Sequence, residues 1–241
     1  MIDTHCHLLP QLDDGPASDR AALALASGLA ASGVTFVLCT PHYSSRYPTD
    51  HVEALRQEAA LVRLLESERI DLEIAVAAEV SPERAIAADP DELVARSISG
   101  RFALVELLPD TSEVSLGTIS ARLGELDLVP IFAHPERCRA LARDLAPLDD
   151  ARREGALVQV VATSLTGRWG AEVEAVAWRL VDTGRTDVIA SDAHHRRHGV
   201  VLQRAAALIE DRLGETVRRE LTERRPKCIV SGIHPDAGGD S

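Results

Sequence analysis

The chain opens with the stretch MIDTHCHLLPQLDDGP, residues 1–16, which places two histidines and two adjacent aspartates around a short apolar run. Imidazole and carboxylate groups are costly to bury unless a partner compensates them, and a metal ion is the obvious partner. The first seven residues are expected to form a strand. Because residues i and i+2 of a strand point to the same face, His5 and His7 would point together and Cys6 would point away. The stretch therefore predicts a buried strand that delivers a pair of metal ligands.

An apolar strand followed by an amphipathic helix recurs along the chain about seven times. The first helix is expected to start after Ser18, a candidate N-cap, and to end before Gly33. Further strands are expected over 34–40, 70–80, 101–107, 128–134, 156–162 and 186–194. Further helices are expected over 50–68, 89–97, 113–126, 148–154 and 172–183, and two closing helices over 200–224. Such alternation indicates parallel strands buried on both faces, as in an α/β barrel or an open doubly wound sheet. No G-x-G-x-x-G follows any expected strand, which disfavours a dinucleotide-binding fold.

Length and composition indicate a single globular domain. Barrels of alternating strands and helices commonly use about 200 to 250 residues, so we expect one domain over 1–234 and a flexible tail over 235–241.

The formal net charge of −12 argues against a nucleic-acid-binding surface, because clustered Lys and Arg hold phosphate backbones. Residues 21–39 carry no formal charge, but Gly33 divides them into a helix and a strand, so no membrane insertion is expected.

Cysteine usage predicts a cytoplasmic protein with free thiols. The four cysteines have no CxxC spacing, and the chain has no secretory signal at its start. A cysteine-dependent tyrosine phosphatase would need a thiolate followed by five residues and an arginine. That spacing is absent at each of the four positions, Cys6, Cys39, Cys138 and Cys228.

Nearly every expected strand ends in His, Asp or Glu. The residues concerned are His5, His7, His42, Glu79, Glu106, His134, Asp192 and His194. Active sites of parallel α/β folds lie at the carboxyl ends of the strands, so one pocket would collect these side chains. By the alternation of strand residues, Asp192 and His194 are also expected to point together. Imidazole and carboxylate ligands suit Zn, Mn or Fe. The alternative is a set of separately satisfied polar residues that closes the top of the barrel.

Six short motifs carry a resemblance to a known superfamily. DTHCHLLPQLDDGP, TPHY, AEV, VEL, HPER and SDAH occur in this order. Together they resemble the polymerase and histidinol phosphatase (PHP) superfamily, and within it the bacterial metal-dependent tyrosine-protein phosphatases associated with capsule and exopolysaccharide synthesis. The resemblance runs from Ile2 to about His194. It implies a PHP fold, a distorted seven-stranded (β/α)7 TIM-like barrel, with three divalent metal ions per chain, manganese first and iron or zinc as alternatives.

The resemblance also implies which residues hold each metal. The first would be held by His5, His7, Glu79 and Asp192, the second by Glu79, Glu106 and His134, and the third by Asp14, His42 and His194. Asp13 is a weaker ligand candidate, because an Asp-Asp-Gly sequence is also an ordinary turn.

The implied catalytic residues are Arg137, Asp192 and His194. Arg137 would be the phosphate clamp, since a guanidinium offers two parallel donors to adjacent phosphate oxygens. Asp192, His194 or a metal-bound water would protonate the leaving group. The chain has SDAHHRRHG where this branch commonly has SDAHN and a spaced arginine, so the second anion-binding arginine could be Arg196 or Arg197.

The implied reaction is hydrolysis of a phosphomonoester by in-line attack of a metal-bridging hydroxide. The substrate would be a phosphotyrosine protein, for example a bacterial tyrosine kinase of polysaccharide synthesis. One alternative is histidinol phosphate or another small phosphomonoester, and a second is a non-catalytic metal-binding regulatory barrel. Deamination or other amidohydrolase chemistry also uses H-x-H barrels, but the DDGP and HPER motifs argue against it.

Overall fold

The computed structural model describes residues 1–198 and 200–237. Its strands form two sheets in which every pairing is parallel. The first sheet has the order β1 (Ile2–Cys6), β2 (Phe36–Cys39), β4 (Glu73–Val76), and the second has the order β3 (His42–Tyr43), β5 (Glu79–Val80), β6 (Phe102–Glu106), β7 (Val129–Ala133), β8 (Leu157–Val161), β9 (Val188–Ala190). The predicted α/β class with parallel strands is confirmed.

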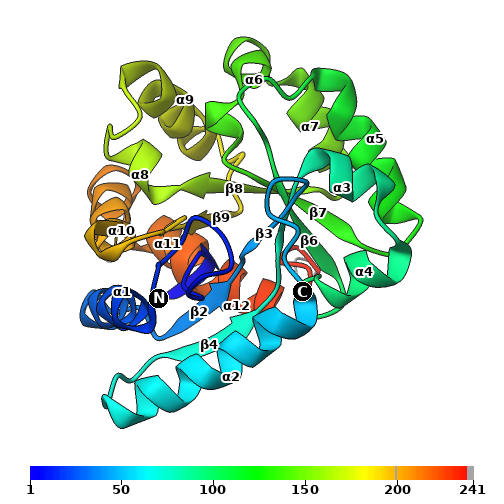
Figure 1. Cartoon of the computed structure of the whole chain (residues 1–241). Coiled ribbons are helices and arrows are strands. Elements are labelled where there is room, and N and C mark those ends of the chain that lie inside the picture. The colour runs from blue at the N-terminus through cyan, green and yellow to red at the C-terminus, as the bar shows by residue number, and fades with distance from the viewer. Residues whose placement is uncertain (199, 238–241) are drawn as a thin grey trace.

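Helices follow the strands along the chain. They are α1 (Asp19–Ala31), α2 (His51–Ser67), α3 (Pro82–Ala87), α4 (Pro90–Ala95), α5 (Glu113–Gly124), α6 (Arg139–Arg143), α7 (Ala146–Arg153), α8 (Ala162–Leu165), α9 (Ala171–Asp182), α10 (Val201–Leu213), α11 (Glu215–Arg219) and α12 (Arg225–Val230). Short 3-10 turns, η1 (Pro135–Arg137) and η2 (Arg196–His198), follow β7 and β9, and a π-helical turn, η3 (Glu220–Arg224), precedes α12. Figure 1 shows the strands gathered at the centre of the molecule and the longer helices around them.

The first helix forms as its sequence predicts. Ser18 is the N-cap of α1, and its hydroxyl accepts a hydrogen bond from the backbone N–H of Ala21 at 3.3 Å. One face of α1 is buried, including Leu25 and Leu29. Gly33 lies past the helix end with φ +85°, a conformation that glycine adopts without steric cost.

One of the expected strands is divided into two segments, which corrects its predicted continuity: the strand over 70–80 is interrupted between β4 and β5. The expected strand over 34–40 corresponds to β2, and a further short strand, β3, follows it beyond Pro41. Pro41 has no N–H to donate to a neighbouring strand, and the N–H of Ala78 bonds to the carbonyl of Arg96 at 3.0 Å instead of to a strand. These breaks move the chain from the first sheet to the second.

The first and last strands meet at their carboxyl ends. An isolated parallel bridge joins Cys6 to Ala193, and the N–H of His7 donates to the carbonyl of Ala193 at 2.9 Å. The N–H of Asp192 donates to the carbonyl of His5 at the same distance. The expected last strand, 186–194, ends at Ala190, so strand alternation does not govern the residues beyond it.

Aliphatic side chains fill the core, and an apolar layer lies directly beneath the polar strand ends. This layer includes Phe102, Leu104, Ile131, Leu157 and Val188, each no more than 2 % exposed. Glu106 follows Phe102 and Leu104 on the same face of β6, because alternate residues of a strand share a face. The apolar layer therefore supports the polar groups above it.

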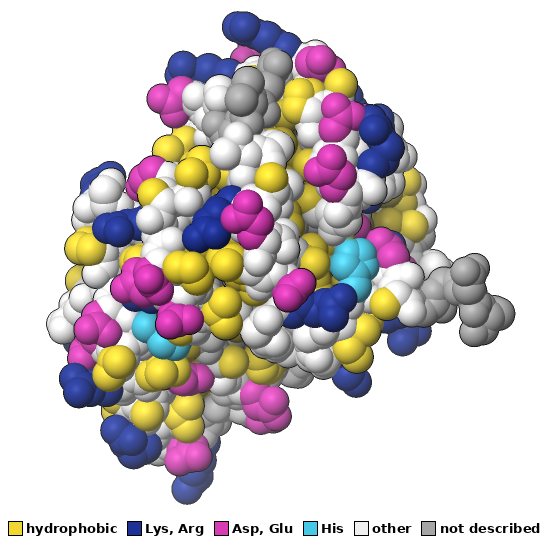
Figure 2. All heavy atoms as spheres, turned by 90° about the vertical axis from the view of Figure 1, so that its right-hand side faces the viewer, with side chains coloured by type: hydrophobic (Ala, Val, Ile, Leu, Met, Phe, Trp, Pro, Cys, Tyr) yellow, Lys and Arg dark blue, Asp and Glu magenta, His cyan; other side chains and the backbone are white. Residues whose placement is uncertain are grey.

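The surface carries charges of both signs, and the described part of the expected tail contacts the rest of the molecule. On the face shown in Figure 2, basic side chains lie among acidic ones and form no continuous patch. No helix in the described part of the chain combines the length and apolarity needed to cross a bilayer. Within the expected tail, the carboxylate of Asp236 accepts a hydrogen bond from Arg225 at 2.8 Å, and residues 238–241 lie outside the described residues.

Candidate metal centre

The structure brings all nine predicted metal ligands together at the carboxyl ends of the strands. Three groups of side chains have ligand atoms that lie within 4.8 Å of one another: His7, Asp14, His42 and His194; His5, His7 and Asp192; and His42, Glu79 and Glu106. The ninth residue, His134, joins them because its Nε2 lies 2.9 Å from Oε1 of Glu79.

Glu79 lies at the centre of this cluster. Its Oε2 is 3.4 Å from Nε2 of His5, 3.3 Å from Nε2 of His7 and 3.0 Å from Nδ1 of His42, while Oε1 faces His134. Burial opposes ionisation of this carboxyl, but the charge of His5 and hydrogen bonds to the surrounding imidazoles hold its pKa well below the ordinary value. A buried carboxylate with both oxygens among imidazoles is suited to bridge two cations.

Hydrogen bonds at Nδ1 fix how His5 and His7 face the centre. Nδ1 of His5 lies 2.8 Å from Oε1 of Gln159, and Nδ1 of His7 lies 2.7 Å from Oδ2 of Asp13. Because these oxygens accept, each Nδ1 carries the proton in the neutral ring and each Nε2 carries a lone pair. The two Nε2 atoms are 3.2 Å apart, so their lone pairs repel unless a proton or a metal cation lies between them. This donor set fits a metal ion.

Asp13 orients ligands rather than adding one. Its Oδ2 also accepts from the backbone N–H of His42 at 2.9 Å, and its Oδ1 accepts from the N–H of Gly15 at 2.9 Å. Burial opposes ionisation of Asp13, yet these bonds and the bond from His7 lower its pKa to about 2. Asp13 belongs to none of the three groups of candidate ligands among the described residues. Its role as a partner of His7 is one that the sequence analysis missed.

A second carboxylate, Asp192, links the cluster to Arg137. Oδ1 of Asp192 lies 3.5 Å from Nε2 of His5, and Oδ2 accepts from Nη2 of Arg137 at 2.8 Å. Burial opposes ionisation, but the charges of His5 and Arg137 lower the pKa of Asp192. By contrast, burial and the charge of Glu79 raise the pKa of Glu106. Divalent cations would relieve this repulsion between carboxylates.

The group of His7, Asp14, His42 and His194 is the most open of the three. Oδ1 of Asp14 lies 3.5 Å from Nε2 of His42 and 3.4 Å from Nε2 of His194, and the Asp14 side chain is 47 % exposed. The ring of His194 stacks on that of His7 with centroids 3.9 Å apart. Burial and the charge of His7 lower the pKa of His194, so its ring favours the neutral form that binds metals.

Two candidate ligands have backbone conformations that are rare for residues other than glycine. His134, which follows β7, has φ +41°, and Asp192, which follows β9, has φ +50°. Left-handed conformations of this kind are strained for ordinary residues and are concentrated at functional sites. Because the backbone at Asp192 is left-handed, the strand does not continue through this residue. The predicted i, i+2 alternation is therefore wrong as the explanation of why Asp192 and His194 lie together.

The cluster forms one wall of a cavity of about 350 Å³. The lining also includes Arg137, the residue predicted to be the phosphate clamp, together with Arg168 and Trp169, which the sequence analysis did not identify. Arg196 and Arg197 are exposed and are not among the residues that line this cavity. Arg168 and Trp169 occur in the turn TGRWG, for which no motif signalled a site.

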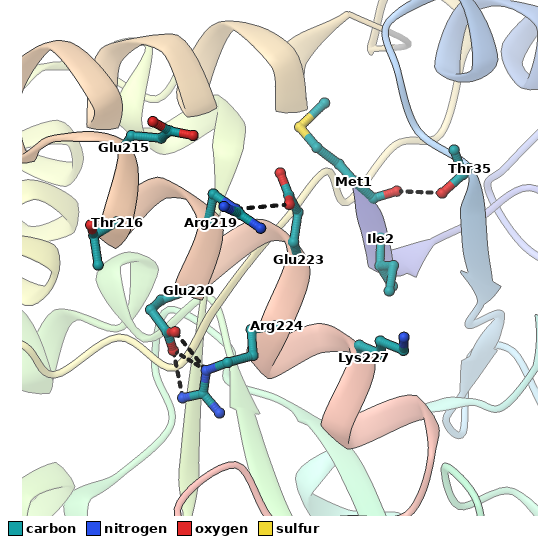
Figure 3. A pocket seen from close by; sticks show the side chains of 10 residues that line it. All are labelled: Met1, Ile2, Thr35, Glu215, Thr216, Arg219, Glu220, Glu223, Arg224 and Lys227. Atoms are coloured by element: carbon teal, nitrogen blue, oxygen red, sulfur yellow. Dashed lines mark hydrogen bonds and ion pairs between the residues drawn. The ribbon is translucent and has the colours of Figure 1, made fainter.

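A larger cavity, of about 650 Å³, lies at the opposite ends of β1 and β2. Figure 3 shows two ion pairs among its charged side chains: Nε of Arg219 lies 3.5 Å from Oε2 of Glu223, and Nη2 of Arg224 lies 2.5 Å from Oε2 of Glu220. It has no imidazole among its lining residues. The smaller cavity, where the candidate ligand atoms converge, is therefore the better candidate active site.

The thiols do not supply a nucleophile to the cavity. Cys6 and Cys39 are fully buried, and burial raises the pKa of both thiols well above the ordinary value. None of the four cysteines lines the cavity at the metal cluster.

Comparison with known proteins connects this geometry to a family. The family model described as "Capsular polysaccharide synthesis, CpsB/CapC" matches residues 1–231. The chain is 29% identical over 196 residues to the putative tyrosine-protein phosphatase CapC of Staphylococcus aureus, covering 80% of this chain and 77% of that protein. It is 27% identical over 226 residues to the tyrosine-protein phosphatase YwqE of Bacillus subtilis (strain 168), covering 92% and 89%.

Solved structures show the same fold. The structure described as YwqE from Bacillus subtilis and CpsB from Streptococcus pneumoniae, unique metal-dependent tyrosine phosphatases, matches with a TM-score of 0.86 and 24% identity and covers 97% of this chain and 95% of that chain. Dihydropyrimidinase from Brevibacillus agri NCHU1002 matches with a TM-score of 0.59 and 12% identity, covering 96% and 70%. At these identities the likeness concerns the fold alone.

Proposed function

Because the chain belongs to the CpsB/CapC family, we propose that it is a metal-dependent protein-tyrosine phosphatase that acts in the regulation of capsule or exopolysaccharide synthesis. The observation that carries this proposal is the convergence of imidazoles and carboxylates on Glu79, beside Arg137, in one cavity. The relatives named as tyrosine-protein phosphatases support the substrate class. A phosphotyrosine protein, for example a bacterial tyrosine kinase of polysaccharide synthesis, is the proposed partner.

The proposed ligands would hold three divalent ions, with manganese first and iron or zinc as alternatives. They are His5, His7, Asp14, His42, Glu79, Glu106, His134, Asp192 and His194. When bound, the ions supply Lewis acidity and a nucleophilic water at neutral pH. The opposed lone pairs of His5 and His7, 3.2 Å apart, support this assignment.

Arg137 is the proposed phosphate-binding residue. One guanidinium nitrogen is held by Asp192, and Nε is buried without a hydrogen-bond partner among the described residues. A phosphoryl oxygen would provide the acceptor that this buried donor lacks. Arg196 and Arg197 follow His194 on the exposed rim, where either could meet a more distant anionic group of the substrate.

Asp192 and His194 are the proposed proton-handling residues. The leaving group of a phosphotyrosine is a phenolate, whose pKa near 10 makes it a better leaving group than an alkoxide. Proton donation therefore helps the reaction but does not decide its rate. The two side chains are close to each other, since Nδ1 of His194 lies 3.6 Å from Oδ1 of Asp192.

The proposed architecture is a distorted (β/α)7 barrel of the PHP type in one domain over 1–234. The bridge between Cys6 and Ala193 supports closure between the first and last strands. If β2 with β3 and β4 with β5 are each counted as one interrupted strand, the proposed barrel has seven strands. Free thiols at Cys6, Cys39 and Cys138 are in keeping with a cytoplasmic location, which we also propose.

A metal analysis combined with a substrate panel tests the proposed function. The purified protein should contain divalent metal and hydrolyse a phosphotyrosine peptide, and His7→Ala should lose metal and activity together. A preference above tenfold for histidinol phosphate would replace the substrate class. Inactivity toward p-nitrophenyl phosphate with Mn, Fe, Zn and Co would favour a non-catalytic metal-binding barrel instead.

A further inference from the structure

Trp169 is the aromatic residue that lines the cavity beside Arg137. The chain has only two Trp, two Tyr and three Phe, and in the described part of the chain Trp169 is the one member of these residue types that lines this cavity. Tyr47 stacks on His42, with ring centroids 5.4 Å apart, and lines a separate cavity on another side of the metal cluster. Its side chain is 49 % exposed, although a large apolar ring is normally buried. An exposed indole beside a phosphate-binding residue needs an explanation.

The ring is held in place rather than loose. Its Nε1–H donates to Oγ1 of the buried Thr163 at 2.9 Å, and the N–H of Arg168 donates to the carbonyl of Thr163 at 3.2 Å. Gly167 and Gly170 on either side have φ +76° and +91°, which allows the tight turn that presents the ring. Trp169 is therefore a fixed part of the cavity wall.

The indole also contacts the proposed phosphate-binding residue. The guanidinium carbon of Arg137 lies 4.3 Å from the centroid of the Trp169 ring, a cation–π distance. The same guanidinium donates to Asp192. Arg137 is thus held between a carboxylate of the metal cluster and the indole, while about half of the indole surface remains open.

Resting on the proposed function, we propose that Trp169 is the specificity-determining residue that selects aryl phosphates. When Arg137 holds the phosphoryl group, the aromatic ring attached to the ester oxygen lies next to the open part of the indole and packs against it. Phosphotyrosine has its ring directly on that oxygen, whereas phosphoserine and histidinol phosphate have a methylene there. The contact therefore favours the binding of aryl over alkyl esters, in addition to the better leaving group that a phenolate provides.

The chain offers a matched control in its other tryptophan. Trp178, in α9, also carries an arginine on its ring, with the guanidinium carbon of Arg212 at 4.8 Å from the centroid. Trp178 is not among the residues that line the metal cavity. Trp178→Leu thus removes the same type of pair at a distance from the site.

The test compares two competitive inhibitors, phenylphosphonate and methylphosphonate, in the metal-loaded wild type, Trp169→Leu, Trp169→Phe and Trp178→Leu. The wild type should bind phenylphosphonate more tightly, and Trp169→Leu should reduce the ratio of the two Ki values by about threefold to tenfold, the size of one aromatic contact. Trp169→Phe should keep most of the preference, and Trp178→Leu should keep all of it. If Trp169→Leu does not fold, Trp169→Gln, which retains a donor for Thr163, provides the same comparison.

An equal rise of both Ki values in Trp169→Leu would overturn the inference, because it would mean that the indole only positions Arg137. Ki values that both stay at the wild-type level in Trp169→Leu would also overturn it. Either result would leave the proposed function standing, since the wild type would still be an active phosphatase. A metal-loaded wild type without activity on a phosphotyrosine peptide would instead contradict the proposed function, and the inference with it.

Discussion

Replacing Asp13 with Asn should destabilise the metal-free protein by an amount that the structure sets. The Asp13 side chain is fully buried and receives hydrogen bonds from Nδ1 of His7 and from two backbone N–H groups. These contacts lower its pKa from 3.8 to about 2. A carboxyl whose pKa is lower in the folded state stabilises that state by about 2 kcal/mol at pH 7. Asp13→Asn should lose most of this free energy.

The pH dependence gives the prediction its sign. The contribution of Asp13 is complete above its unfolded pKa, 3.8, and is lost as the pH falls toward its folded pKa of about 2. Urea unfolding of chelator-treated wild type and Asp13→Asn should therefore differ by about 2 kcal/mol at pH 7 and by about half as much near pH 3. A constant difference, or none at pH 7, would refute the role given to Asp13.

A variant of the neighbouring aspartate, Asp14, distinguishes an effect on metal binding from an effect on folding stability. Asp14 is a proposed ligand, but its side chain is half-exposed and its contacts among the described residues are with the rings of His42 and His194. Asp14→Asn should weaken metal binding and leave the stability of the metal-free protein nearly unchanged. Asp13→Asn should do both, with a roughly 10- to 100-fold loss of metal affinity, because it loosens the ring of His7. Titration with Mn²⁺ followed by calorimetry distinguishes the two variants.

Three further predictions follow from the site. Arg137→Lys should retain the metals but reduce kcat/KM for a phosphotyrosine peptide by roughly tenfold to hundredfold, since lysine cannot replace the guanidinium fork. Cys39→Ala should keep full activity, and Cys39 of the wild type should resist alkylation while the protein is folded, because burial raises the pKa of that thiol. Metal affinity should rise from pH 6 to pH 8, because nearby carboxylates raise the pKa of His5 and of His7 despite burial, and both rings must lose a proton to bind; a flat profile in a Mn²⁺ titration would contradict this.

The position of the candidate site could be predicted because it depends on topology. Parallel strands bring all their carboxyl ends to one side, so polar residues that end separate strands meet whatever the details of the helices. This is why Glu79 and His134, 55 residues apart, lie 2.9 Å from each other. The alternation argument was right for His5 and His7, whose Nε2 atoms lie 3.2 Å apart at the end of β1, although the pairing of β1 with β2 is irregular between Asp3 and Cys6.

The remainder depends on local geometry that periodicity does not encode. Asp192 adopts a left-handed conformation just beyond β9, so strand alternation gave the right neighbours for the wrong reason. The helices α3, α6, α8 and α12 are at most six residues long, too short to show a helical period in the sequence. Trp169 reaches the cavity through a turn with two glycines, and only the folded chain shows which ring that turn presents.

The charge of the site explains how an acidic protein can take an anionic substrate. Four carboxylates among the proposed ligands, Asp14, Glu79, Glu106 and Asp192, would repel a phosphate from the cavity, and the net charge of −12 adds to that repulsion. The three divalent ions of the proposed centre would carry six positive charges, which exceed the four negative ones, and Arg137 adds a seventh. Metal binding would therefore reverse the sign of the local field as well as supply chemical reactivity. The imidazoles allow this reversal because, as neutral ligands, they add donor atoms without adding charge.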